Sequence, residues 1–243
     1  MRQKIWSGFT ALGILIGSWF YMTSCSINTD PYISQQLLEP FDTLVLNSVF
    51  NVRLVQGDHY GVEVSGAQEI AESVTFHIEN KTLIIDNRDA PLWQHPSLDP
   101  PTILITFTKL GLVRAEETCN ISSDNTITMD TFGITLGSKL NIAELKLNCQ
   151  LFYYWNTSPV GGELTLSGHS DLIRLYNGSL LSIDASQLTA HDALIVNGSQ
   201  LDIHVYADQH LYYSITGTGN IYLTGNPAVI DAGPITSSGK LIH

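Results

Sequence analysis

A repeat of roughly 20 residues in the last third of the chain constrains the fold more than any other feature of the sequence. Short polar segments such as Asn177-Gly178-Ser179 and Asn197-Gly198-Ser199 recur at this spacing, with apolar residues in register between them. The aligned apolar sets are Leu181, Leu201, Ile221 and Leu241; Ile183, Ile203 and Leu223; and Leu175, Ile195, Ile215 and Ile235. A fixed period of this size is typical of a solenoid, in which each coil buries its apolar side against the next.

A coil of this length fits a parallel β-helix, because repeats built from two helices need about 33 residues or more. The small polar segments supply the sharp turns between strands. The alternative is a β-sandwich with chance alternation, but three ladders in a common register argue against it. We therefore predict an all-β fold in which residues 118–243 form β-helix repeats, with a less regular register before residue 165.

Residues 41–117 carry the alternation of apolar and polar residues that indicates half-buried strands. Clear examples are Phe50, Val52 and Leu54, and later Ile103, Ile105 and Phe107. The stretch at 88–101 contains four prolines and is predicted to be a loop. Residues 67–73 are the one place where a helical turn is expected. We treat 41–117 as the strand-rich N-terminal part of the fold.

The start of the chain has the layout of an export signal. Arg2 and Lys4 precede a mostly apolar run, which ends in small residues before Cys25. Met22-Thr23-Ser24-Cys25 resembles the lipobox of bacterial lipoproteins, with Met and Ser in place of the usual Leu and Ala or Gly. We predict that residues 1–24 are a lipoprotein signal peptide and that Cys25 is lipidated. An uncleaved membrane anchor is the alternative.

Residues 25–40 are largely polar and are predicted to be a tether. Ser26 stands where an Asp would resemble an inner-membrane retention signal, which favours the outer membrane. With Cys25 bound to lipid, Cys119 and Cys149 remain, either as a disulfide or as buried free thiols.

The charge of the chain excludes one class of partner. The formal net charge is −12, and it becomes −14 when Arg2 and Lys4 are removed with the signal. Because phosphate binding needs a basic surface, we predict no nucleic-acid partner.

The order of the strand motifs supports a family resemblance. The motifs are Phe41-Asp42-Thr43-Leu44-Val45-Leu46, Phe50-Asn51-Val52-Arg53-Leu54-Val55-Gln56-Gly57, Val62-Glu63-Val64, Asn80-Lys81-Thr82-Leu83-Ile84-Ile85 and Gly217-Thr218-Gly219-Asn220-Ile221-Tyr222-Leu223-Thr224-Gly225-Asn226-Pro227. Over about residues 41–243 the chain resembles the head GIN domain family of putative auto-transporter adhesins. The resemblance implies a right-handed parallel β-helix similar to pectin lyases, without a recognised catalytic set, and a role in cell adhesion. The chain departs from the family between residues 118 and 165, where Gly-Ser-Gly turns are sparse.

Enzymatic motifs are missing from the sequence. It contains no Gly-rich phosphate loop, no His-Glu-x-x-His and no Gly-x-Ser-x-Gly. Because the histidines lack close ligand spacing, we predict no metal site, no cofactor and no catalytic residue. The enzymatic alternative is a pectin-lyase-like carbohydrate-active enzyme, which would need Asp171, Asp192 and Arg174 to converge in one groove. Asp171 and His191 are one repeat apart and could stack.

The run Phe152-Tyr153-Tyr154-Trp155 is the strongest candidate for a binding site. In a strand, Phe152 and Tyr154 face one side while Tyr153 and Trp155 face the other, so one pair must lie outside the coil's own core. Exposed aromatic side chains can stack on sugar rings or anchor a protein partner. The alternative is that a loop from elsewhere covers them. We take these four residues as the predicted binding face.

The sequence therefore predicts a lipid-anchored, non-enzymatic binding or adhesion module of the cell envelope, with a polysaccharide or protein ligand. Besides the enzymatic alternative, a self-assembling envelope protein stays open. The repeat strand at Leu241 to His243 has no evident cap, and an open strand edge invites pairing. A homo-oligomer formed through the C-terminal coil is therefore expected under that alternative.

Overall fold

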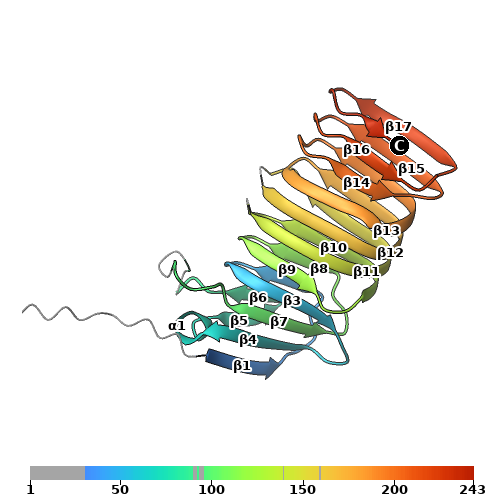
Figure 1. Cartoon of the computed structure of the whole chain (residues 1–243). Coiled ribbons are helices and arrows are strands. Elements are labelled where there is room, and N and C mark those ends of the chain that lie inside the picture. Colours follow the sequence, from blue (N-terminus) through green and yellow to red (C-terminus); the bar gives the residue numbers. More distant parts are fainter. Residues whose placement is uncertain (1–30, 90–91, 93–95, 139, 159) are drawn as a thin grey trace, which may run out of the picture.

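The computed structural model describes residues 31–243 apart from 90–91, 93–95, 139 and 159, and consists almost entirely of β-strands. Strands from successive coils are stacked along one axis, from the N-terminal strands at one end to the C-terminal strands at the other (Figure 1). The predicted β-helix is therefore confirmed. The predicted signal peptide and Cys25 lie outside the described residues.

From residue 112 onward the strands wind into coils and pair in parallel with strands one coil away. They are β8 (Leu112–Ala115), β9 (Cys119–Ser123), β10 (Ile127–Leu136), β11 (Asn141–Asn156), β12 (Gly161–Asn177), β13 (Leu180–Asn197), β14 (Ile203–Tyr206), β15 (His210–Ile215), β16 (Ile221–Thr224), β17 (Val229–Ile235) and β18 (Leu241–Ile242). The long strand β13 pairs with β14 through its first half and with β15 through its second half. Each long strand therefore turns a corner. We call the side with β8, β15 and β17 flank A, and the side with β9, β14, β16 and β18 flank B.

A ladder of apolar side chains fills the inside of flank B, one from each coil. In order along the stack it consists of Val52, Ile121, Ala143, Leu164, Ile183, Ile203, Ile221 and Leu241. All but Leu241 are buried, and Leu241 packs against this core at the end of the stack. Like residues meet because each coil repeats the same inward positions, which is how a solenoid buries its apolar surface.

The regular spacing of the repeat fails at one step of the stack. Ile203 pairs with Ile221 and Ile195 pairs with Tyr213, so both steps are shorter than the repeat. The predicted partners, Leu223 for Ile203 and Ile215 for Ile195, were wrong by two positions. Ile195, Ile203, Ile215 and Leu223 are nevertheless all buried, because side chains alternate with period two and a shift of two keeps the same residues inward. Leu201 and Ile235, which belong to the same predicted ladders, are 39% and 49% exposed.

Buried asparagines shape the turns from flank A to flank B. Asn177 donates from Nδ2 to the carbonyl oxygen of Leu181 at 2.8 Å, and its Oδ1 accepts from the backbone N–H of Ser179 at 3.2 Å. Asn197, its register partner one coil on, repeats this pattern. The predicted Asn-Gly-Ser turns are therefore held by amide side chains that pair the backbone groups of the bend.

The N-terminal part is not wound in the order of the sequence. Its elements are β1 (Pro31–Leu37), β2 (Thr43–Leu46), β3 (Phe50–Gln56), β4 (Gly61–Ala67), α1 (Gln68–Ala71), β5 (Thr75–Glu79), β6 (Thr82–Asp86) and β7 (Thr102–Phe107). β2 lies between β6 and β8, and β3 lies between β7 and β9, with all four pairings parallel. The coil formed by β2 and β3 is therefore inserted between two coils that come later in the chain. β8 and β9 lie on either side of the predicted boundary at residues 117 and 118.

Antiparallel strands finish the N-terminal end of the stack. β4 pairs with β7 and with β1, and β5 pairs with β6. Residues 31–37 therefore form an edge strand, which corrects the prediction that they belong to a tether. Ser34, Gln35 and Gln36 suit this position, because an edge strand is largely solvated, whereas Ile33 and Leu37 expose apolar side chains there. The predicted helical turn is α1, and the described residues between β6 and β7 contain no strand, as expected for the loop.

No helix among the described residues has the length and apolar character needed to cross a bilayer.

Candidate binding surfaces

The aromatic run lies in the second half of β11, on flank A. Phe152 and Tyr154 point inward and are 0% and 1% exposed. Phe152 stacks on Phe132 of the neighbouring coil with ring centroids 6.4 Å apart. The hydroxyl of Tyr154 lies 3.2 Å from that of Ser179, and burial raises the pKa of Tyr154. These two residues belong to the core, so the prediction that they are part of a binding face is wrong.

Tyr153 and Trp155 alternate with these core residues along β11 and point outward. Trp155 is 63% exposed and meets the ring of Tyr176, its register partner on β12, edge-to-face at 6.3 Å. Tyr176 is itself 41% exposed, although it was not among the predicted site residues. The sequence does contain a sign of this contact, because Tyr176 follows Trp155 by one coil and therefore lies beside it.

A shallow hollow of about 390 Å³ surrounds this aromatic pair on flank A. Its lining is almost entirely apolar and consists of Leu151, Tyr153, Tyr154, Trp155, Arg174, Leu175, Tyr176 and Leu194. Arg174 supplies the one charged group of the hollow. We call Tyr153, Trp155, Arg174, Tyr176 and Leu194 the aromatic patch. It combines flat apolar rings with a guanidinium that can donate several hydrogen bonds.

A larger groove of about 640 Å³ lies at the corner where the chain passes from flank B to flank A. It runs from the N-terminal part to the middle of the solenoid, with Asp42, Lys109 and Met129 towards one end and His169 and Asp171 towards the other. It is lined mainly by polar residues, in contrast to the aromatic patch.

Histidines pair with aspartates along this corner in successive coils. His169 Nε2 lies 3.3 Å from Asp171 Oδ1, His191 Nδ1 lies 3.0 Å from Asp208 Oδ1, and His210 Nε2 lies 3.0 Å from Asp231 Oδ2. The hydrogen bond that His191 donates to Asp208 raises the pKa of His191. Within the described residues, His169, Asp171 and His191 are the group that could hold a metal ion, with one ligand atom from each inside a mutual distance of 4.8 Å.

The sequence did not reveal this group, because metal ligands were expected close together in the chain. Asp171 and His191 do lie together, as their spacing of one coil suggested. His204 and His210, the nearest histidine pair in the sequence, do not form such a group. His204 stacks on Tyr222 of flank B at 4.7 Å, whereas His210 lies at the corner beside Asp231.

The residues of the enzymatic alternative do not share a groove. Asp171 lines the corner groove, whereas Arg174 lines the hollow of the aromatic patch. Asp192 is exposed opposite Leu172 and lines neither depression. A pectin-lyase arrangement of carboxylates and a base is therefore not assembled by these three residues.

Both remaining cysteines are free and buried. Of the two alternatives left open by the sequence, the structure therefore shows buried thiols. Burial raises the pKa of Cys119 to about 12, and it also raises the pKa of Cys149. Because the thiolate is the reactive form, neither cysteine is suited to chemistry at the surface.

Solved structures of bacterial proteins share this fold over most of their length. A putative adhesin from Bacteroides fragilis NCTC 9343 is 17% identical, with a TM-score of 0.74 over 88% of this chain and 97% of that one. A putative lipid binding protein from Parabacteroides distasonis ATCC 8503 is 15% identical, with a TM-score of 0.63 over 89% and 98%. A putative adhesin from the same strain is 15% identical, with a TM-score of 0.58 over 89% and 98%. At these identities the likeness shows the fold alone.

None of the curated proteins matches the chain in sequence. The sequence profile described as "Putative auto-transporter adhesin, head GIN domain" matches residues 40–227, which is most of the chain and includes the aromatic patch and the corner groove. This match shows that the chain, a parallel β-helix with an inserted N-terminal coil, belongs to the head GIN domain family of putative auto-transporter adhesins.

Proposed function

We propose that the chain is a non-catalytic adhesion module of the bacterial cell envelope that binds a polysaccharide through its aromatic patch. Membership of a family of putative adhesins supports a binding role. The observation that carries the proposal is the exposed edge-to-face pair of Trp155 and Tyr176 on flank A.

Such a pair is unusual on a surface that only needs to be soluble. Large apolar groups gathered on a surface mark places where a ligand or partner docks. A sugar ring presents an apolar C–H face and a polar edge of hydroxyls. The rings of Trp155 and Tyr176 can take the face, and the guanidinium of Arg174, in the same hollow, can donate to the hydroxyls.

The test is a glycan and polysaccharide binding array with residues 26–243, which include every described strand. We expect binding that Trp155→Ala reduces at least about tenfold, because loss of a central aromatic anchor costs about 2 kcal/mol or more. Tyr222→Ala is the matched control, because Tyr222 is a partly exposed aromatic residue on flank B. Equal losses in both variants, or no glycan bound, would refute the polysaccharide proposal and direct attention to a protein partner.

The export of this module is also part of the proposal. The predicted signal peptide of residues 1–24 and the predicted lipidation at Cys25 would place the module at the outer membrane, on its periplasmic or outer face. Metabolic labelling with an alkyne fatty acid tests this. We expect label in the full chain and none in Cys25→Ser. Label that persists in this variant would show that the anchor lies elsewhere.

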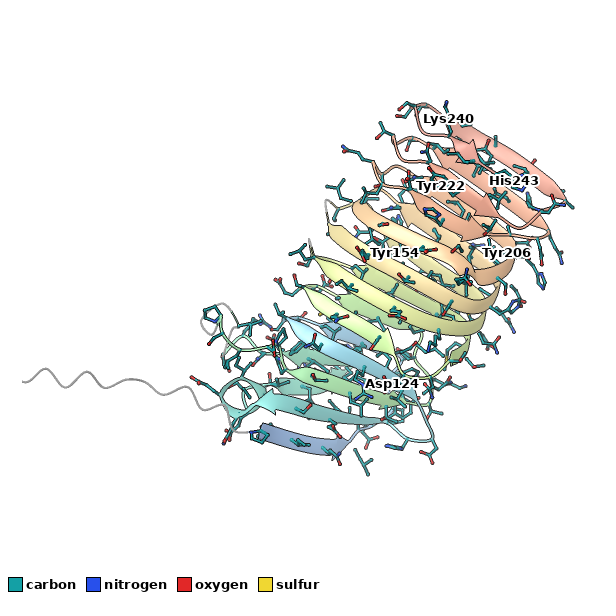
Figure 2. The ribbon with its side chains drawn as sticks, in the orientation of Figure 1. Asp124, Tyr154, Tyr206, Tyr222, Lys240 and His243 are labelled. Carbon is teal, nitrogen blue, oxygen red and sulfur yellow. The ribbon has the colours of Figure 1, made fainter. Side chains whose placement is uncertain are left out.

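Self-association is a second candidate, favoured by the last coil. Among the described strands, β17 pairs only with β15 and β18 only with β16, so both leave an edge unpaired. Val229, Ile230 and Ile235 of β17 are between 43% and 49% exposed. Lys240 and His243 lie at this end of the stack (Figure 2). We expect dimers in light scattering that Ile230→Asp abolishes, whereas a monomer at every concentration would exclude this assembly.

A further inference from the structure

The corner of the solenoid places three metal-ligating side chains together outside the aromatic patch. His169 and Asp171 belong to β12, and His191 belongs to β13, one coil further along. His169 pairs in register with Thr189, which places Asp171 opposite His191 two positions later. The rings of His169 and His191 meet edge-to-face at 5.4 Å. The coil period therefore builds this group from residues that are distant in the chain.

Hydrogen bonds assign the proton of His169. The hydroxyl of Thr189 donates to the carbonyl oxygen of Gly168 at 3.0 Å, so it can only accept from His169 Nδ1, which lies 3.2 Å away. In the neutral ring the hydrogen is therefore on Nδ1 and the lone pair is on Nε2. That lone pair faces the carboxylate oxygen of Asp171 at 3.3 Å. Nε2 of His169 and the carboxylate of Asp171 are therefore placed side by side as two ligand atoms for a cation.

A second carboxylate orients His191. Asp208 accepts from His191 Nδ1 at 3.0 Å, which leaves Nε2 available as a ligand. Backbone hydrogen bonds hold Asp208 in place. The N–H of Asp208 donates to the carbonyl oxygen of Ala190 at 3.1 Å, and the N–H of Gln209 donates to the carbonyl oxygen of His191 at 3.0 Å. A carboxylate behind a histidine is the usual outer support of a metal ligand.

We propose that His169, Asp171 and His191 form a binding site for a single Zn²⁺ ion. Two imidazoles and one carboxylate favour Zn²⁺ over Ca²⁺ or Mg²⁺, which prefer ligand sets made only of oxygen. The ligand atoms lie within 4.8 Å of one another, so small rotations of these half-exposed side chains bring them to coordination distance. The aspartates of the corner provide a negative field that attracts the ion.

The site opens towards solvent at the end of the corner groove. His169 and Asp171 line this groove, and the side chains of the three ligands are between 41% and 57% exposed. Three protein ligands leave one position of a tetrahedral ion free for water or for an oxygen of a bound molecule. The groove and the ion together would form a second contact surface, separate from the aromatic patch.

The test is isothermal titration of residues 26–243, stripped with a chelator, with ZnCl₂. We expect one ion per chain and no binding of CaCl₂. His169→Ala and His191→Ala should each weaken binding at least tenfold, and Asp208→Asn by about 10- to 100-fold, as found for outer-shell carboxylates. The matched control is His210→Ala, because His210 pairs with Asp231 at the same corner without a second histidine in its group.

Circular dichroism checks that each variant is folded, and the absorption spectrum of the Co²⁺ form reports on the ligands directly. We expect a four-coordinate Co²⁺ spectrum in the unaltered chain and its loss in His191→Ala. The proposal is overturned if no stoichiometric Zn²⁺ binds, or if His210→Ala weakens binding as much as His169→Ala does.

Discussion

The ring of Tyr153 lies across the backbone of Gly133, its register partner one coil earlier, so closely that a Cβ at Gly133 would overlap the ring. The missing side chain of Gly133 thus leaves the space that the Tyr153 ring of the aromatic patch occupies. Gly133→Ala should destabilise the fold by about 1 kcal/mol, because the ring must swing into solvent. In a Tyr153→Ala background the same change should cost nothing. Denaturant unfolding of the double-mutant cycle measures this coupling, and equal costs in both backgrounds would contradict it.

Gly168 has a different role, because its backbone has a φ of +107° and a Cβ there would overlap the carbonyl oxygen of Leu147. Both the φ angle and the Leu147 carbonyl belong to the backbone, which cannot move aside as a side chain can. We expect Gly168→Ala to lower the free energy of unfolding by at least about 2 kcal/mol. Gly111→Ala is the control, since the nearest atom to its Cβ would be the carbonyl oxygen of Asp42 at 3.6 Å. Similar unfolding curves for the two variants would show that the conformation at Gly168 is not required.

The turn amide of Asn177 should contribute strongly to stability. It is fully buried; its Nδ2 donates to the carbonyl oxygen of Leu181, and its Oδ1 accepts from the N–H and the hydroxyl of Ser179. Asn177→Ala removes these bonds and leaves the N–H of Ser179 buried without its side-chain partner, so we expect a loss of about 2–3 kcal/mol in thermal or denaturant unfolding. Asn148→Ala, at an exposed position, should change stability by less than about 0.5 kcal/mol. A loss as small for Asn177→Ala would mean that water replaces the amide.

The two thiols should be unreactive in the folded protein. Since burial raises the pKa of Cys119 to about 12, its thiolate is scarce at pH 8, and Cys149 is raised in the same direction. Ellman's reagent should modify neither residue in native 26–243 and both in guanidinium. Fast modification of one thiol without denaturant would show that its strand opens, and the loss of both free thiols after denaturation would reveal a disulfide between them.

Much of the β-helix could be predicted because its core repeats. The apolar ladder through Ile183 and Ile203 was visible in the sequence, and so were the asparagine turns. The partners of Ile195 and Ile203 on the following coil were not, because a coil shortened by two positions keeps the same alternation of side chains. Period two identifies inward residues but carries no information on which strands are neighbours.

The same limit explains what was missed in the candidate sites. Alternation showed that one pair of the aromatic run must lie outside, yet it could not say that Phe152 and Tyr154 are the inner pair. That choice depends on register with the neighbouring coils, where Tyr153 meets Gly133. Tyr176 comes from the coil after Trp155 and was not joined to it. Asp171 and His191 were expected to stack from their spacing, but His169 was not included with them.

The insertion of β2 and β3 between later strands has a consequence for the order in which the chain can fold. Phe50 pairs with Cys119, and Thr43 pairs with both Thr82 and Leu112. The first coil to be synthesised therefore cannot close until about half of the chain has been made. Each coil beyond β9 packs on the coil that precedes it in the chain. Insertion of a whole coil could therefore lengthen the C-terminal half of the solenoid, but not the N-terminal half.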